Sequence, residues 1–168
     1  DTLSFVGGAG DFDNNGKIRN PDDINAQITG TVENISIALS QENCALADAV
    51  RLKVFYIPSD ICDEITLLKA LQEAFPKEPS PVVSTLPVPL QPFKGQEIQI
   101  QVIASRDWRS KNDFQFESQI LETPGDVPSL RPDVTTALRA GEFIAVSNRT
   151  AAHFKADLDT SLDGTGQS

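Results

Sequence analysis

The sequence predicts an α+β fold in which a mixed β-sheet carries two helices packed on one of its faces. Two segments repeat apolar residues at steps of three and four positions, which is the period of an amphipathic helix. Other segments alternate apolar and polar residues, which is typical of a strand with one buried face. The order strand, helix, strand, helix, strand, strand favours helices layered against a single sheet.

The first strand and the first helix are expected near the start of the chain. Residues 3–6 form a short apolar strand that runs into Gly7-Gly8-Ala9-Gly10. Asp22 and Asp23 stand at the start of the helix, where carboxylates suit unpaired amides and the helix dipole. The helix is expected to end near Asn43, and its apolar face consists of Ile24, Ile28, Val32, Ile35 and Leu39.

Another strand, another helix and two further strands follow. In the strand at residues 49–57, Val50, Leu52, Val54 and Tyr56 alternate with Arg51, Lys53 and Phe55. We expect Asp60 to cap the second helix. The apolar stripe of that helix consists of Ile61, Ile65, Leu68, Leu71 and Phe75. Prolines place the strand at residues 81–88 at an edge or interface, and residues 97–105 form the last strand.

The remainder of the chain predicts a linker and the start of a repeat. Periodicity disappears over residues 107–129, which indicates a linker. The apolar alternation of residues 144–149 matches that of residues 3–8, although chance similarity of two short strands stays open. We therefore expect one domain at residues 1–106 and a second, truncated copy at residues 130–168. Because the chain starts without Met, we also expect a missing N-terminal segment.

Composition argues against several classes of partner. The chain has 14 basic and 24 acidic residues and a net charge of −10, which disfavours binding to nucleic acid. Its apolar runs are shorter than the roughly 20 residues of a membrane span, so no membrane partner is expected. Cys44 and Cys62 lie outside any CxxC pair and are expected to be free thiols of a cytoplasmic protein. With His153 as the single histidine, we expect no metal site and no cofactor.

Four segments carry a resemblance to a known family. They are residues 32–35, residues 47–55, Glu73-Ala74-Phe75-Pro76 and residues 97–104. In order and spacing they resemble the Rid family of enamine and imine deaminases, which includes YjgF-like and endoribonuclease L-PSP-like proteins. The resemblance implies a chorismate-mutase-like fold and a homotrimer with clefts between subunits, or a ring built from tandem copies. It also implies a first strand before Asp1, a place that residues 134–140 are expected to fill.

The family resemblance implies a binding site for a small-molecule metabolite. An arginine after the second helix would hold the substrate carboxylate, and a glutamate in the last strand would position water for imine hydrolysis. Pro81 stands at the arginine position and Gln99 at the glutamate position, so both groups are altered here. We expect the cleft to be lined by Gly7, Gly8, Lys69, Pro81, Val83 and Gln99.

The altered site leaves two functions open. A divergent enzyme could act on C=N bonds if another cation replaces the arginine, and Arg139, Arg149 and Lys69 are candidates. Each of these side chains could equally be a solvated surface charge. Alternatively, the chain is a non-catalytic domain that binds a metabolite or forms the structural half of a tandem protein. The two hypotheses differ in whether a cation reaches the cleft floor near Pro81 and Gln99.

Overall fold

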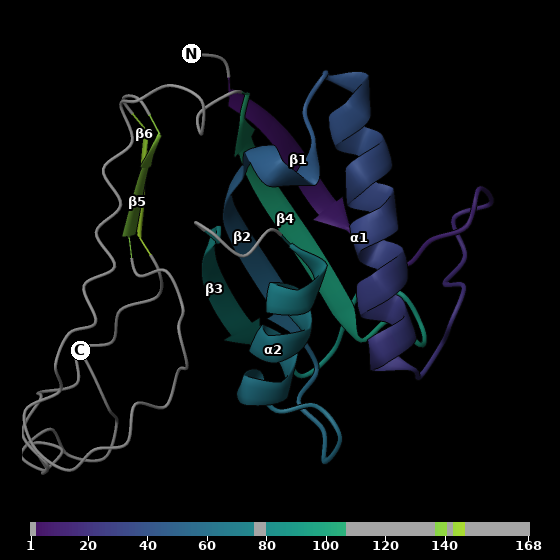
Figure 1. Ribbon diagram of the computed structural model, residues 1–168. Coiled ribbons are helices and arrows are strands. Elements are labelled where there is room, and N and C mark those ends of the chain that lie inside the picture. The colour runs from purple at the N-terminus through teal and green to yellow at the C-terminus, as the bar shows by residue number, and fades with distance from the viewer. Residues whose placement is uncertain (1–2, 76–79, 107–136, 141–142, 147–168) are drawn as a thin grey trace, which may run out of the picture.

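The computed structural model describes residues 3–75, 80–106, 137–140 and 143–146 (Figure 1). The described elements are β1 (Leu3–Ala9), α1 (Ile24–Gln41), a short 3-10 helix (Leu46–Asp48), β2 (Ala49–Tyr56), α2 (Glu64–Ala74), β3 (Val82–Pro87), β4 (Ile98–Ser105), β5 (Ala137–Ala140) and β6 (Phe143–Val146). The main sheet has the order β1-β4-β2-β3, with β2 and β3 parallel and the other pairs antiparallel. Both α-helices lie on one face of this mixed sheet, which confirms the α+β prediction.

The core lies between this sheet and the two helices. Alternate residues of β2 point into it, so Leu52, Val54 and Tyr56 are buried while Lys53 is half-buried on the other side. The predicted stripe of α1 is also buried, and it consists of Ile24, Ile28, Val32, Ile35 and Leu39. Burying one such aliphatic side chain stabilises a fold by about 1.5–3 kcal/mol. The two periodicities in the sequence therefore predicted the core face correctly except at Val50. That residue packs in a second apolar cluster on the other face, because the register of β2 with β4 shifts between Ala49 and Arg51.

The N-terminal end of α1 is fixed by side chains. Asp23 is its N-cap and accepts a 3.1 Å hydrogen bond from the backbone N–H of Ala26, as the sequence predicted. Gln27 is completely buried, and its Nε2 donates to the backbone oxygens of Asn20 at 2.8 Å and Gly95 at 2.7 Å. Its Oε1 accepts from the N–H of Glu97 at 2.8 Å. This amide therefore joins the helix to the chain entering β4.

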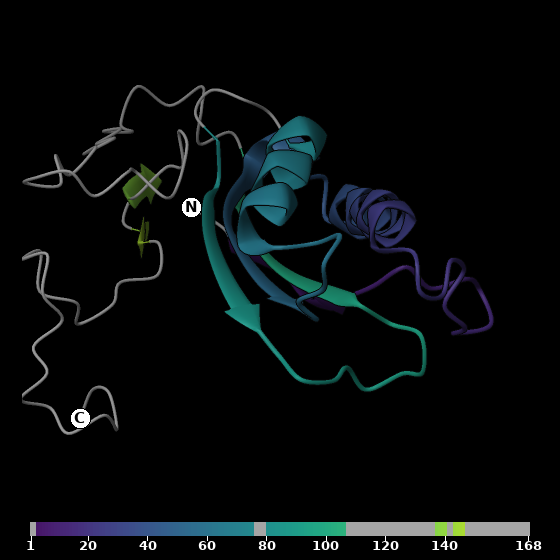
Figure 2. The ribbon, with the colours of Figure 1, turned by 90° about the horizontal axis from the view of Figure 1, so that it is seen from below.

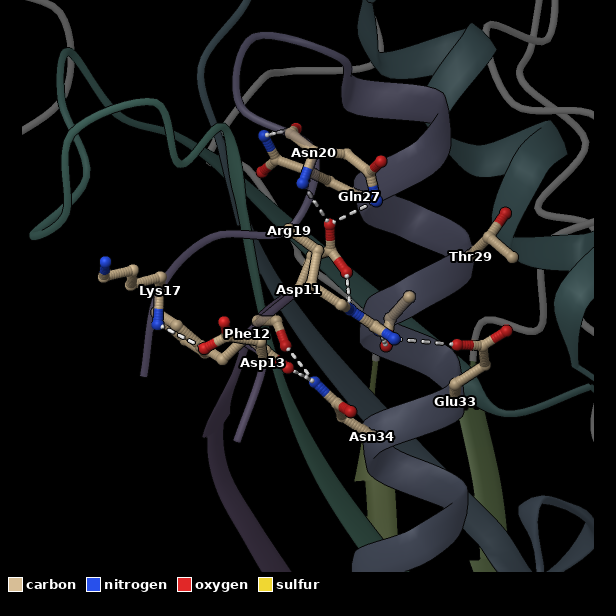
Figure 3. A network of polar contacts seen from close by, with 12 residues as sticks. Asp11, Phe12, Asp13, Lys17, Arg19, Asn20, Gln27, Thr29, Glu33 and Asn34 are labelled. Atoms are coloured by element: carbon tan, nitrogen blue, oxygen red, sulfur yellow. Dashed lines mark hydrogen bonds and ion pairs between the residues drawn. The ribbon is translucent and has the colours of Figure 1, made fainter. Parts of the chain in front are cut away.

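A polar network between β1 and α1 holds the intervening loop (Figure 3). Arg19 Nε donates to the buried carboxylate of Asp11 at 2.6 Å, and Asn20 Nδ2 donates to the same carboxylate at 2.8 Å. Arg19 also donates to the backbone oxygen of Gly30 at 2.8 Å. A Cβ at Gly30 would lie 1.9 Å from Asp11 Oδ1, so this close approach requires glycine.

The predicted start of α2 was wrong. The N-cap is Asp63 rather than Asp60, and its carboxylate accepts from the N–H of Thr66 at 2.8 Å. A short antiparallel bridge closes a turn just before the helix, so Ile61 lies outside it and is 66% exposed. Ile65 is 37% exposed because it lies at the margin of the helix face. The stripe that α2 buries consists of Leu67, Leu68, Leu71 and Phe75.

The hairpin formed by β5 and β6 packs on the sheet face away from α1 and α2 (Figure 2). Leu138, Ala140 and Ala145 form a second apolar cluster with Val50 and Val82. The expectation that this segment fills a place beside β1 was wrong, because β5 pairs with β6 and the described partner of β1 is β4. The predicted linker and most of the predicted second copy lie outside the described residues.

Candidate functional site

The sheet face opposite the helices, here called the open face, carries the polar and apolar strand residues that the core does not use. Its members lie one position out of phase with the buried core residues of each strand. They are Phe5 and Gly7 on β1, Arg51, Lys53 and Phe55 on β2, Val82, Ser84 and Leu86 on β3, and Gln99, Gln101 and Ile103 on β4. The β5–β6 hairpin covers the end at which Val82 lies.

A glycine bulge brings two of the predicted cleft residues together. The register of β1 with β4 shifts so that Gly7 and Gly8 both lie opposite Gln101. Gly8 has φ of +46°, and a Cβ there would lie 2.9 Å from Nε2 of Gln99. The positive φ explains the glycine at this position, because the end of the flexible Gln99 side chain could move aside for a Cβ. Gly8 and Gln99, both expected to line the cleft, are therefore neighbours.

A cation lies beside this pair. The Lys53 ammonium nitrogen is 5.0 Å from the centroid of the Phe55 ring, a distance at which a cation is attracted to an aromatic face. Phe55 is the β4 register partner of Gln99, and Lys53 is that of Gln101. We call the group formed by Gly8, Lys53, Phe55 and Gln99 the Lys53–Gln99 site. It combines a positive charge, an apolar wall and an amide on the half of the open face that the hairpin leaves uncovered.

Other predicted cleft residues lie elsewhere. Pro81 and Val83 are buried on the helix side of the sheet, where they line a small cavity with Leu68, Leu71 and Phe75. Its volume of about 10 Å³ is enough for one water molecule at most. The structure therefore does not bring these residues to the open face.

Of the cations that the sequence proposed as substitutes, the two that the structure describes do not join the Lys53–Gln99 site. Lys69 is exposed on α2, on the opposite side of the sheet. Arg139 is exposed on β5, and Arg149 lies outside the described residues. Lys53 was not among the predicted site residues, although the alternation in β2 places it with Phe55 on one face. The missing information was the register of β2 with β4, which brings Phe55 next to Gln99.

The open face lacks a carboxylate within its described strand residues. Gln99 can donate and accept hydrogen bonds, but its amide cannot take a proton from water at neutral pH. The nearest acidic residue along β4 is Glu97, which precedes the strand. Its Oε2 is buried without a described partner, and burial raises the pKa of this carboxyl, with smaller effects from Asp22 and Asp23.

Thiol and metal chemistry find little support among the described residues. Cys44 and Cys62 are free and buried. Burial raises the pKa of the Cys62 thiol, and the charges of Asp63 and Glu97 raise it further, which is unfavourable for a nucleophile. The described residues contain no group of three His, Cys, Asp or Glu side chains that would hold a metal. None of the described helices is sufficiently long and apolar to span a membrane.

Comparisons with known proteins agree with this fold. The family profile described as Endoribonuclease L-PSP matches residues 1–106. The structure of the Rid protein YyfB from Yersinia pestis matches with a TM-score of 0.54 and 19% identity, covering 62% of this chain and 78% of that one. RidA from an Antarctic Psychrobacter bacterium matches with a TM-score of 0.54 and 22% identity, covering 62% and 80%.

A third solved structure, E. coli TdcF with bound serine, matches with a TM-score of 0.52 and 23% identity, covering 62% of this chain and 81% of that one. No curated protein sequence matches the chain. Identities of this size show the fold, while the profile match extends over more than half of the chain. The chain therefore belongs to the Endoribonuclease L-PSP family and is a Rid-like protein.

Proposed function

We propose that this domain binds a small carboxylate-bearing metabolite at the Lys53–Gln99 site without hydrolysing it. The observation that carries the proposal is the Lys53 ammonium held 5.0 Å from the Phe55 ring, in the strand next to Gln99. The ammonium would pair with the carboxylate, and the ring would contact the ligand's apolar part. The Gln99 amide would bind a carbonyl or amino group through its donor or acceptor.

The absence of turnover follows from the same side chains. Imine hydrolysis requires a group that accepts a proton from the attacking water. Gln99 can orient a water molecule but cannot accept that proton, and the described strand residues of the open face include no carboxylate. TdcF, whose fold this chain shares, is described with bound serine, a small carboxylate ligand. That ligand class fits a site with one ammonium and one amide.

Binding can be tested by isothermal titration calorimetry with 2-oxopentanoate on the full chain. We expect Lys53→Met to weaken binding by about tenfold, which corresponds to the loss of one charge-assisted contact. Lys69→Met is the matched control because it removes an exposed lysine from the other side of the sheet. Equal affinities for the wild-type chain and Lys53→Met would overturn the proposal.

The lack of catalysis has its own test. Release of 2-oxo acid and ammonia from freshly generated 2-iminopropionate should proceed at the uncatalysed rate when the folded chain is added. Acceleration that disappears in Gln99→Ala would show that an amide suffices for hydrolysis here. The domain would then be a divergent deaminase rather than a binding domain.

The hairpin favours a second proposal, that it begins a tandem copy which docks on the open face. Its apolar residues Leu138, Ala140 and Ala145 pack against Val50 and Val82 within one chain. Docking within the chain would let tandem copies replace the subunits of a trimer. Hydrogen exchange of β5 and β6 should then be independent of protein concentration. Protection that increases with concentration would instead indicate association between separate chains.

A further inference from the structure

Among the described residues, two polar atoms of the open face are buried and have no hydrogen-bond partner, beside the Lys53–Gln99 site. They are Nε of Arg51 and Oγ of Ser84, and Ser84 is 1% exposed. A buried donor or acceptor that makes no hydrogen bond is unfavourable, so such atoms are rare in folded proteins. Two of them in adjacent strands therefore indicate a missing partner.

The sheet register places these groups together. Ser84 is the β3 partner of Lys53, while Arg51 pairs with the neighbouring Val82. Arg51 and Lys53 are two residues apart in β2, so both side chains leave the same face, with Cα atoms about 6.6 Å apart. The face thus presents two cations in line and a hydroxyl group beside them.

The β5–β6 hairpin does not supply the missing partner. Its residues in contact with the sheet, Leu138, Ala140 and Ala145, are apolar and pack on Val82 and Val50. They limit access of water at this end but offer no side-chain acceptor to Arg51. The whole chain carries a charge of −10, yet the described strand residues of the open face carry only positive charge. An anion of the ligand is the partner that fits this local charge.

We propose that Arg51 and Ser84 form a second anion subsite, and that the metabolite is a dicarboxylate of about five carbons. The inference rests on the proposed function, since Lys53 would hold one carboxylate while Arg51 and Ser84 hold the other. A guanidinium matches the two oxygens of a carboxylate, and the serine hydroxyl can donate to one of them. A monoacid of the same length would leave Arg51 Nε unpaired.

The test compares 2-oxoglutarate with 2-oxopentanoate, which have the same chain length and differ by one carboxylate. In calorimetric titrations of the full chain, we expect 2-oxoglutarate to bind about tenfold more tightly. Arg51→Met should abolish this preference and leave 2-oxopentanoate binding unchanged. Lys53→Met should weaken the binding of both acids.

A second readout addresses Arg51 directly and does not depend on a variant that folds. The NMR resonance of the Arg51 Nε–H group should shift on addition of 2-oxoglutarate but not of 2-oxopentanoate.

Ser84→Ala, which removes only a hydroxyl group, should reduce the preference for the diacid by about threefold.

The outcomes separate the two proposals. Binding of both acids with equal affinity would overturn the second subsite and leave the proposed function intact. The same conclusion would follow if Arg51→Met kept the preference for 2-oxoglutarate. If neither acid binds, both the proposed function and the subsite are wrong.

Discussion

The polar network between β1 and α1 and the polar side chains of the open face differ in how completely their hydrogen bonds are satisfied. In the network, the Asp11 carboxylate accepts from Arg19 and Asn20, and the Gln27 amide uses both its nitrogen and its oxygen (Figure 3). On the open face, Arg51 Nε is buried and has no partner in the part of the chain that the structure describes. Polar groups that satisfy one another stabilise a fold, whereas preorganised groups that lack partners are suited to bind a ligand.

Removing the Asp11 carboxylate, which lies at the centre of the polar network, should have the largest effect on stability. Asp11→Ala leaves Arg19 and Asn20 without their shared carboxylate. We expect the free energy of unfolding to fall by about 3 kcal/mol, as for other buried ion pairs that lose one partner. Urea denaturation followed by circular dichroism measures this change. A loss below about 0.5 kcal/mol would show that the network does not hold the loop.

The glycine bulge connects the two regions and should show an intermediate effect. Gly8→Ala places a Cβ 2.9 Å from Gln99 Nε2 and requires a positive φ from alanine. We expect a destabilisation of about 1 kcal/mol together with weaker binding of 2-oxopentanoate, because Gln99 must move. Gly16→Ala is a useful control: it has a positive φ but no atom near the added Cβ. If both variants lose ligand affinity equally, Gly8 has no special role in the site.

The carboxyl group of Glu97 should show the smallest effect, and the effect should depend on pH. Burial raises its pKa above the ordinary value of 4.5, so the folded state favours the protonated form. Its contribution to stability is therefore present below about pH 4.5 and is lost as the pH rises through the folded-state pKa.

Glu97→Gln removes this titration. The variant should be more stable than the wild-type chain at pH 7, by less than about 1 kcal/mol because solvent still reaches part of the side chain. The difference should shrink below pH 4.5, and thermal unfolding at both pH values measures it. A variant that is less stable than wild type at pH 7 would contradict the sign of the raised pKa.

The fold could be predicted largely from local patterns. The periodicity of α1 and the alternation of β2 are local properties of the sequence, and both predicted the correct buried face. The prediction of where α2 starts was wrong because Ile61 continues the apolar spacing of the helix. The turn that precedes α2 depends on the backbone bridge between Ser59 and Cys62, which residue spacing does not encode. The predicted position of β5 was wrong for the same reason, since the pairing of β5 with β6 is a tertiary property.

The contacts of the candidate site could be predicted only in part. Gly8 and Gln99, which the resemblance placed in the cleft, are in contact, while their role in binding stays a prediction. Lys53 was not predicted because the family cation belongs at the position of Pro81, which lies on the helix side of the sheet. The register of β2 with β4, which no local pattern specifies, places Lys53 and Phe55 beside Gln99 and Gln101.

The polar network between β1 and α1 satisfies its own hydrogen bonds, whereas the open face is proposed to bind a ligand. An NMR titration of the full chain with 2-oxopentanoate tests this contrast most directly. The account predicts that resonances of Gly8, Lys53 and Gln99 shift with one common dissociation constant, while those of Asp11 and Gln27 stay unchanged. Saturable shifts confined to Asp11 and Gln27, or no shifts at the Lys53–Gln99 site, would contradict it.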